Sequence, residues 1–179
     1  VKMSKTRMKT QDIVYIAIGA TLLAVCSQIS IPAAIPFTLQ TFAAAFVGGF
    51  LGVKKGVSSV VIYILLGVAG IPVFAGFRSG IPTLLGGTGG YIIGLLPFAA
   101  IAGFFAERFR GKLLPMVVGM LLGLISCYIL GTAWYVHLYA EKGLAYAISA
   151  CVLQFIIPDI IKIAVAALLV KRIAPIVRK

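Results

Sequence analysis

Long apolar runs dominate this chain and leave few folds open to it. A transmembrane helix needs about 20 mostly apolar residues, so a chain of 179 residues has room for about six such helices and little else. Only 11% of the residues are charged, against about 25% in soluble domains. We therefore expect an all-α integral membrane protein, in which residues 1–179 form a single domain without a cleavable signal peptide. The six predicted spans are 12–29, 39–51, 57–70, 90–106, 114–135 and 144–170.

The basic residues fall almost entirely on one side of this predicted six-span arrangement. One side holds thirteen of the sixteen: Lys2, Lys5, Arg7, Lys9, Lys54, Lys55, Arg108, Arg110, Lys112, Lys171, Arg172, Arg178 and Lys179. Cytoplasmic loops carry an excess of Lys and Arg, so we expect both termini, including the basic flank 1–10, in the cytoplasm. Membrane topology explains the net charge of +12, and no nucleic-acid partner is expected.

Residues 67–94 combine an apolar character with many helix-breaking glycines and prolines. Pro72 and Pro82 each remove a backbone donor, so this segment is not one straight transmembrane helix. Irregular backbone near lipid is tolerated only where protein buries it or where it lines a cavity. The segment, which contains Arg78, is therefore a candidate binding region, and the alternative is an ordinary connector that ends in a glycine-rich helix contact.

Asp159 and Lys162 are charged residues inside the last apolar run. A charge at mid-membrane costs at least about 2.5–3.5 kcal/mol and usually marks a functional, paired residue. The i, i+3 spacing places both side chains on one helix face. Pro158 should open the helix just before them, which favours a ligand pocket. The alternative is a salt bridge that only holds this helix in the bundle.

The chain lacks the residues that catalysis or nucleotide binding would need. Gly86–Gly90 has no following Gly-Lys-Ser/Thr, so it is not a phosphate-binding loop. Four acidic residues and one histidine supply no paired carboxylates, catalytic triad or metal cluster. We expect neither enzyme activity nor a cofactor or metal. The positions of Trp134 and Tyr135 favour membrane-interface anchors over pocket walls.

Five segments together resemble the BioY family, the biotin-binding S components of energy-coupling factor (ECF) vitamin transporters. The most specific are GIPVFAG at 70–76 and GGTGGY at 86–91. The others are IPFTLQT at 35–41, GTAW at 131–134 and FIIPDIIK at 155–162. Two positions depart from the family pattern, since Gly87 replaces a frequent proline and Ile157-Pro158 replaces Pro-Gly.

This resemblance implies an ECF S-component fold of six transmembrane helices, multi-pass in a prokaryotic cell membrane. Such a protein captures biotin from outside and works with a transmembrane T component and two cytoplasmic ATPases, which use the ATP. In the family, small residues on the first helix face the T component. Ala17, Ala20 and Ala24 would fit that role, and the last two form a small-xxx-small pair that permits close helix approach.

Biotin offers two ureido N–H donors, one carbonyl acceptor, an apolar bicycle and a carboxylate. We hypothesise that Asp159 accepts from a ureido N–H, and that Lys162 or Arg78 meets the carboxylate; the swapped orientation stays open. The further predicted contacts are the amides near Thr88 and Gly89, the polar groups of Gln40 and Tyr91, and packing by Phe74, Trp134 and Tyr135. Three alternatives remain: an S component for another small vitamin, a small membrane enzyme, and a purely structural membrane subunit.

Overall fold

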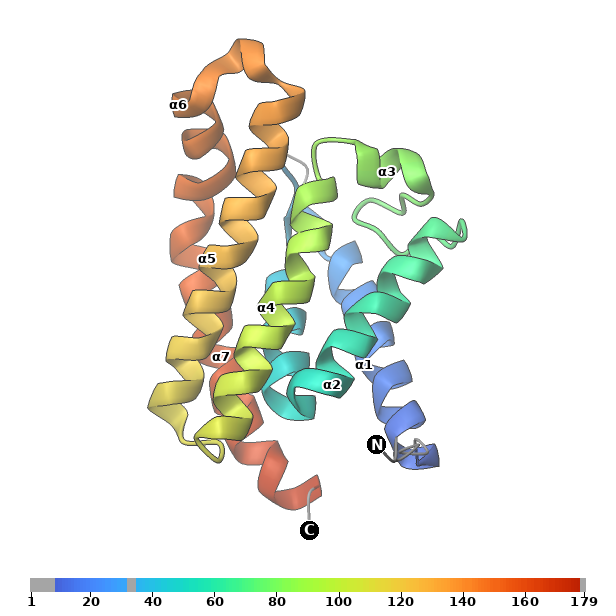
Figure 1. The fold of residues 1–179 in the computed structure, drawn as a ribbon, viewed down its shortest axis with the longest axis vertical. Helices are drawn as coiled ribbons and strands as arrows, with labels where there is room; N and C mark the ends of the chain where they lie inside the picture. Colours follow the sequence, from blue (N-terminus) through green and yellow to red (C-terminus); the bar gives the residue numbers. More distant parts are fainter. Residues whose placement is uncertain (1–8, 32–34, 178–179) are drawn as a thin grey trace, which may run out of the picture.

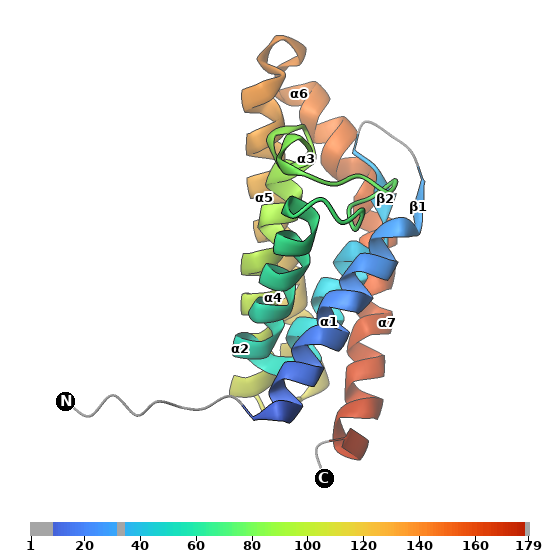
Figure 2. The same ribbon diagram turned by 90° about the vertical axis from the view of Figure 1, so that its right-hand side faces the viewer.

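A computed structural model of the chain describes residues 9–31 and 35–177 (Figures 1 and 2). Most of the predicted basic flank, residues 1–8, therefore lies outside the described residues, as do Arg178 and Lys179. Five long helices dominate the described part of the chain: α1 (Thr10–Gln28), α2 (Gln40–Val68), α4 (Gly89–Arg108), α5 (Leu113–Leu138) and α7 (Gln154–Val177). The short elements are β1 (Ser30–Ile31), β2 (Phe37–Thr38), α3 (Ile81–Leu85), the 3-10 turn η1 (Ala140–Lys142), α6 (Gly143–Ile148) and the π-helical turn η2 (Ser149–Leu153).

Five helical stretches within the described residues are long and apolar enough to cross a membrane. They are α1, α2, α4, α5 and the continuous stretch Gly143–Ile176, which contains α6, η2 and most of α7. The expected helical membrane protein is thereby confirmed in its general class. α4 packs closely against both α2 and α5, while α1 packs on α2, and α7 packs on α2 and α5.

α2 contains a sharp reversal at Gly52, whose backbone is non-helical with φ 80° and ψ −176°. The boundary predicted between the spans 39–51 and 57–70 falls at this reversal, and Lys54 and Lys55 lie within helix just after it. Glycine accepts the positive φ without steric cost. The carboxylate of Glu107 accepts from the backbone N–H of Val53 at 3.0 Å, which satisfies a donor that a helix start leaves unpaired. Figure 1 shows the two halves of α2 meeting at one end of the bundle.

Gly103 brings α4 into backbone contact with this reversal. A Cβ added at Gly103 would lie 2.6 Å from the Val53 nitrogen and 2.7 Å from the Gly52 carbonyl carbon. Both neighbours are backbone atoms, so a rotamer change cannot relieve the clash. The residue is therefore required for the close packing of α4 on α2, in the way that small residues serve membrane helix contacts.

We expect Gly103→Ala to destabilise the fold by about 1–3 kcal/mol, the usual cost of overpacking a well-packed core. The better helix propensity of alanine offsets only about 1 kcal/mol or less. Thermal unfolding in detergent measures the effect. Phe104→Leu is the matched control, because Phe104 follows on the same helix and is 54% exposed. Unchanged or increased stability of Gly103→Ala would show that the two backbones are free to separate.

The last helical stretch departs from regular α-helix earlier than the sequence suggests. Pro158 was expected to open the helix, but α7 runs through it without interruption. The irregular turn is η2, which ends at Leu153, directly before α7 begins at Gln154. Proline removes one intrahelical hydrogen bond and clashes with the carbonyl four residues earlier. The π-helical turn lies directly upstream of this part of α7, and such turns occur frequently at functional sites.

The loops at the end of the bundle opposite the Gly52 reversal are more ordered than expected (Figure 2). The predicted loop between the first two spans contains an antiparallel pair, in which Ser30 pairs with Thr38 and Ile31 with Phe37. Residues 69–80 form an irregular loop closed by the bridge between Phe74 and Arg78. The side chains of Ser27 and Gln28 bind this loop from the end of α1.

Gln28 contributes three of these hydrogen bonds. Its Nε2 donates to the carbonyls of Pro72 at 3.2 Å and Phe74 at 3.1 Å, and its Oε1 accepts from the Phe77 N–H at 3.0 Å. Ser27 Oγ donates to the Val73 carbonyl. The Phe74 ring is fully buried against Gly67 and the Tyr63 ring. Protein groups thus satisfy this irregular backbone, as non-helical backbone near lipid requires.

The predicted partner face on α1 is only partly exposed. Ala20 is 1% exposed and packs inside the bundle, so its predicted role in partner binding is corrected. Ala24 is half-buried against the same core, whereas Ala17 is exposed. The physical reason is that α1 packs on α2 so closely that a Cβ added at Gly19, the neighbour of Ala20, would collide with Ser59.

Candidate functional site

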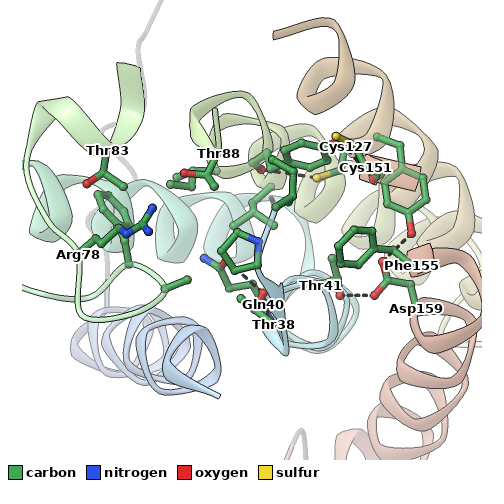
Figure 3. A pocket seen from close by; sticks show the side chains of 18 of the residues that line it. Thr38, Gln40, Thr41, Arg78, Thr83, Thr88, Cys127, Cys151, Phe155 and Asp159 are labelled. Atoms are coloured by element: carbon green, nitrogen blue, oxygen red, sulfur yellow. Dashed lines mark hydrogen bonds between the residues drawn. The ribbon is translucent and has the colours of Figure 1, made fainter. Parts of the chain in front are cut away.

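A pocket lies among the helices at the loop end of the bundle (Figure 3). Counting the part that is open to the surroundings, it contains about 710 Å³ that protein atoms do not fill. Five parts of the chain line it: the hairpin and start of α2, the 69–88 loop, α4, α5, and η2 with α7. The polar and charged lining residues are Thr38, Gln40, Thr41, Arg78, Thr83, Thr88, Tyr91, Tyr128, Asp159 and Lys162.

A buried ion pair forms one side of the pocket. Lys162 Nζ lies 2.7 Å from Asp159 Oδ1, and the two residues are 7% and 2% exposed. Asp159 Oδ1 also accepts from Thr41 Oγ1 at 2.9 Å, and Oδ2 accepts from the Tyr128 hydroxyl at 2.6 Å. A carboxylate has about four acceptor sites, so one site on this group is left for a ligand donor.

Lys162, by contrast, has no donor left. Its ammonium group has three N–H donors, and it binds the Thr38 carbonyl at 2.7 Å and Thr41 Oγ1 at 3.3 Å besides Asp159. The ammonium also lies 3.9 Å from the centre of the Phe37 ring, a distance at which cation–π attraction is favourable. Phe37 in turn stacks on Phe155. The lysine therefore holds the carboxylate, the hairpin and α2 together.

Gln40 and Tyr91 present polar groups that the protein already orients. Gln40 Nε2 donates to the Tyr63 hydroxyl at 2.5 Å, and its Oε1 accepts from Thr38 Oγ1 at 3.3 Å. The Tyr91 hydroxyl lies 2.9 Å from Thr132 Oγ1 and 3.4 Å from the Cys151 carbonyl. Tyr91 therefore links α4 to α5 and to the π-helical turn, and it fixes that wall of the pocket.

Arg78 lies on the opposite side of the pocket from Asp159 (Figure 3). It is exposed, and no carboxylate in the described part of the chain lies within 4.0 Å of its guanidinium. Thr83, whose hydroxyl donates to the Ser79 carbonyl at 2.9 Å, lies beside it in Figure 3. The pocket thus has a carboxylate with one unused acceptor site at one side and, at the other, a cation that no carboxylate of the described residues pairs with.

Seven of the ten predicted ligand-contact residues line this pocket: Gln40, Phe74, Arg78, Thr88, Tyr91, Asp159 and Lys162. The sequence reasoning missed Thr38, Thr41 and Tyr128, although all three have polar groups at the pocket. Tyr128 lies in the middle of the fifth apolar run. A hydroxyl in such a run needs a polar partner, and this signal could have identified Tyr128 as a pocket residue. Thr38 and Thr41 are inconspicuous in sequence, because threonines at helix starts are common.

Three predicted contacts, Gly89, Trp134 and Tyr135, do not line the pocket, and the structure gives them other roles. The Gly89 amide donates to the Gly86 carbonyl at 3.0 Å, so it is already used. Trp134 Nε1 donates to the same carbonyl at 3.0 Å. Tyr135 is 3% exposed, and the centre of its ring lies 4.7 Å from the centre of the Tyr139 ring. Trp134 therefore fixes the glycine-rich turn before α4, and its position at a membrane interface stays a prediction.

Apolar helices around a pocket, with a buried ion pair in its wall, are typical of a polytopic membrane protein that binds a small molecule. The chain belongs to the BioY family, whose family model matches residues 3–179. The probable biotin transporter BioY of Pyrococcus horikoshii is 40% identical over 167 residues, which cover 93% of this chain and 98% of the relative. The biotin transporter BioY of Thermotoga maritima is 38% identical over 170 residues, 91% of this chain and 95% of the relative.

A solved structure shares the fold. The crystal structure of the S-component for biotin from an ECF-type ABC transporter superposes with a TM-score of 0.85 at 26% sequence identity. The similarity covers 93% of this chain and 94% of that one. The predicted family and S-component class are therefore confirmed, by sequence along nearly the whole chain and by structure independently.

Proposed function

We propose that this protein is the biotin-binding S component of an ECF-type ABC importer in a prokaryotic cell membrane. It is a transport protein rather than an enzyme. The observation that carries the proposal is the buried Asp159–Lys162 pair at the wall of the pocket, in a chain of the BioY family. The carboxylate retains an acceptor site for a ureido N–H, which is the group that distinguishes biotin from most small carboxylic acids.

The proposed topology has a single domain of six transmembrane helices, with the two halves of α2 counted separately around Gly52. Support comes from the ends of the bundle. The start of α1 and the end of α7 lie at the same end as the Gly52 reversal (Figure 1), where Lys55, Arg110 and Lys171 also gather. The positive-inside rule then places both termini in the cytoplasm and the pocket toward the outside.

The proposed orientation places the biotin ureido ring at Asp159 and the carboxylate at Arg78. All three Lys162 donors are already used, so a ligand carboxylate there would have to displace an existing partner. Arg78 lies on the other side of the pocket, where an extended ligand tail would end, and no carboxylate of residues 9–31 and 35–177 pairs with its guanidinium. Gln40, Tyr91 and Thr88 would supply further polar contacts.

The proposed partners are a transmembrane T component and two cytoplasmic ATPases, which supply the energy from ATP. The apolar surface of α1 supports this part of the proposal, since Ile13, Val14, Ile18 and Val25 are each at least half exposed. Ala17 lies on the same exposed face. This face, rather than the buried Ala20, is the part of α1 that another membrane helix could contact.

Isothermal calorimetry of the purified protein in detergent tests the function directly. We expect saturable one-to-one binding of biotin, and no comparable heat from riboflavin or thiamine at the same concentrations. A parallel titration follows the fluorescence of the single tryptophan, Trp134, which fixes the turn at the pocket edge. Absence of biotin binding by folded protein would refute the proposal, and saturable binding of another vitamin instead would reassign the substrate.

Arg78→Gln tests the proposed orientation. We expect it to weaken biotin binding by about tenfold or more, about 1.4 kcal/mol, because it removes a charge-assisted contact to the carboxylate. Biotin methyl ester, which lacks that charge, should bind wild-type protein and Arg78→Gln with similar affinity. If Arg78→Gln weakens the ester as much as biotin, the carboxylate does not meet Arg78 and the swapped orientation is favoured.

Trp134→Phe distinguishes a supporting role from a direct ligand contact. The variant loses the hydrogen bond to Gly86 but keeps an aromatic ring, so unfolding stability should fall by about 1 kcal/mol. Biotin affinity should change by less than about fivefold, about 1 kcal/mol, because Trp134 does not line the pocket. Thermal unfolding and calorimetry measure the two effects. A large loss of affinity without a loss of stability would instead place the indole on the ligand.

A further inference from the structure

A second hollow lies at the other end of the bundle from the ligand pocket. It is formed by α2, by the turn after α4 and by the last part of α7, and it contains about 580 Å³ not filled by protein atoms, part of it open to the surroundings. Arg110 and Lys171 line it together with Gly49, Gly111 and four apolar residues. None of these residues takes part in the proposed biotin site.

The two cations of this hollow have no counter-charge in the described part of the chain. No carboxylate there lies within 4.0 Å of Arg110 or Lys171. Glu107, the acidic residue next to this turn, already accepts from the Val53 N–H at 3.0 Å. Arg108, Lys112 and Arg172 lie exposed nearby in the sequence and add further positive charge to this end of the bundle.

Backbone groups of the turn are not available to an anion, so side chains must bind it. The Gly111 amide donates to the Ala106 carbonyl at 2.9 Å, and the Lys112 amide donates to the Phe109 carbonyl at 3.1 Å. Arg110 and Gly111 adopt φ values of 52° and 70°, a left-handed turn that reverses the chain between α4 and α5. The guanidinium and the ammonium are therefore the groups that would bind the ligand.

The rest of the hollow is apolar, which decides between a free anion and a lipid. Ala106, Val170, Ala174 and Pro175 form its wall, and Val170 is only 2% exposed. A free phosphate ion gains nothing from such a wall, whereas the glycerol and first methylenes of a phospholipid would pack on it. In the proposed topology the hollow lies where the membrane-spanning helices end, which is the level of the lipid headgroups.

We propose that this hollow binds the phosphate of an anionic phospholipid, with Arg110 and Lys171 on the phosphate and the α7 wall against the glycerol. Basic pockets between transmembrane helices bind acidic headgroups elsewhere, at about 1 kcal/mol for each cation near the surface. The site would anchor the end of α7 to the turn between α4 and α5 through the lipid.

Native mass spectrometry of the full chain in neutral detergent, titrated with phosphatidylglycerol, tests this proposal. We expect one saturable adduct, and binding of phosphatidylcholine weaker by about tenfold. Arg110→Gln/Lys171→Gln should weaken the phosphatidylglycerol adduct by about tenfold or more. The matched control, Arg108→Gln/Arg172→Gln, removes the same charge from residues that do not line the hollow, and it should weaken the adduct by less than about threefold.

Three results would overturn the proposal. Equal losses in the two double variants would mean diffuse attraction to surface charge, and equal binding of the two lipids would mean no anion recognition. Displacement of the adduct by inorganic phosphate at matched concentration would identify a free-anion site instead. Thermal unfolding checks that each variant is folded. If the first double variant is not folded, Arg110→Gln and Lys171→Gln are compared singly, with an expected loss of about threefold or more each.

Discussion

Asp159→Asn should weaken biotin binding by about 100-fold or more, about 2.7 kcal/mol. The carboxylate accepts from Lys162, Thr41 and Tyr128, and it has one acceptor site left for the ligand. The amide has a single acceptor oxygen, and its NH₂ group would face one of those donors. The variant therefore loses the acceptor for the ureido N–H and also turns part of the pocket wall away from its bound geometry.

Calorimetry with biotin measures this loss, and thermal unfolding in the same detergent separates it from a loss of folded protein. Glu107→Gln is the matched control: it is the same type of change, made at the reversal of α2 at the other end of the bundle. The control should lower stability slightly and leave biotin affinity within about twofold. Wild-type affinity in a folded Asp159→Asn protein would mean that the ion pair is only structural, as in the alternative of a structural membrane subunit.

Lys162→Met should cause the largest loss of stability among single substitutions in this region. It leaves the Asp159 carboxylate 2% exposed and paired only with two hydroxyls. Removing one partner of a buried pair typically costs about 3–5 kcal/mol, because the remaining charge stays buried without compensation. Methionine nearly preserves the volume of the lysine stem, so the effect reports on the charge rather than on packing.

A double-mutant cycle isolates the contribution of the pair. Asp159→Asn/Lys162→Met removes both charges, and it should be more stable than the sum of the single effects predicts by about 2 kcal/mol or more. Unfolding in denaturant or by heat, in one detergent, provides the four stabilities. Additive single effects would show that Asp159 and Lys162 act independently, through their separate contacts to Tyr128 and to the Thr38 carbonyl.

The sequence identified the polar end of the pocket because charge inside an apolar run is costly enough to need a reason. Asp159 and Lys162 stand out for that reason in any helical membrane protein. Arg78 stood out as the charge in a segment that was either a binding region or a plain connector. The partners of these residues did not stand out. Thr41 lies 118 residues from Asp159 in sequence, and nothing local distinguishes it from other threonines.

The turns were the least predictable part of the fold. The reversal within α2 depends on a positive φ at Gly52 and on Glu107 from another helix, and neither the conformation nor the partner is visible in a local pattern. The π-helical turn before Pro158 is likewise not visible in a local sequence pattern, since its position depends on how α7 packs. In the sequence, Trp134 was compatible with an interface anchor or a pocket wall. The direction of its indole N–H depends on the fold and cannot be read from the residue type.

The sequence alone determined that this chain forms apolar helices, that its basic residues concentrate between alternate apolar runs, and that one apolar run contains a charged pair at i, i+3 spacing. Those properties follow from hydrophobicity and from the cost of burying charge, which depend on residue type and spacing. The tertiary structure decided which side chains meet: three donors around Asp159, no free donor on Lys162, and Ala20 turned inward. Contacts between residues more than a hundred positions apart depend on helix rotation and packing, and only the folded chain specifies these.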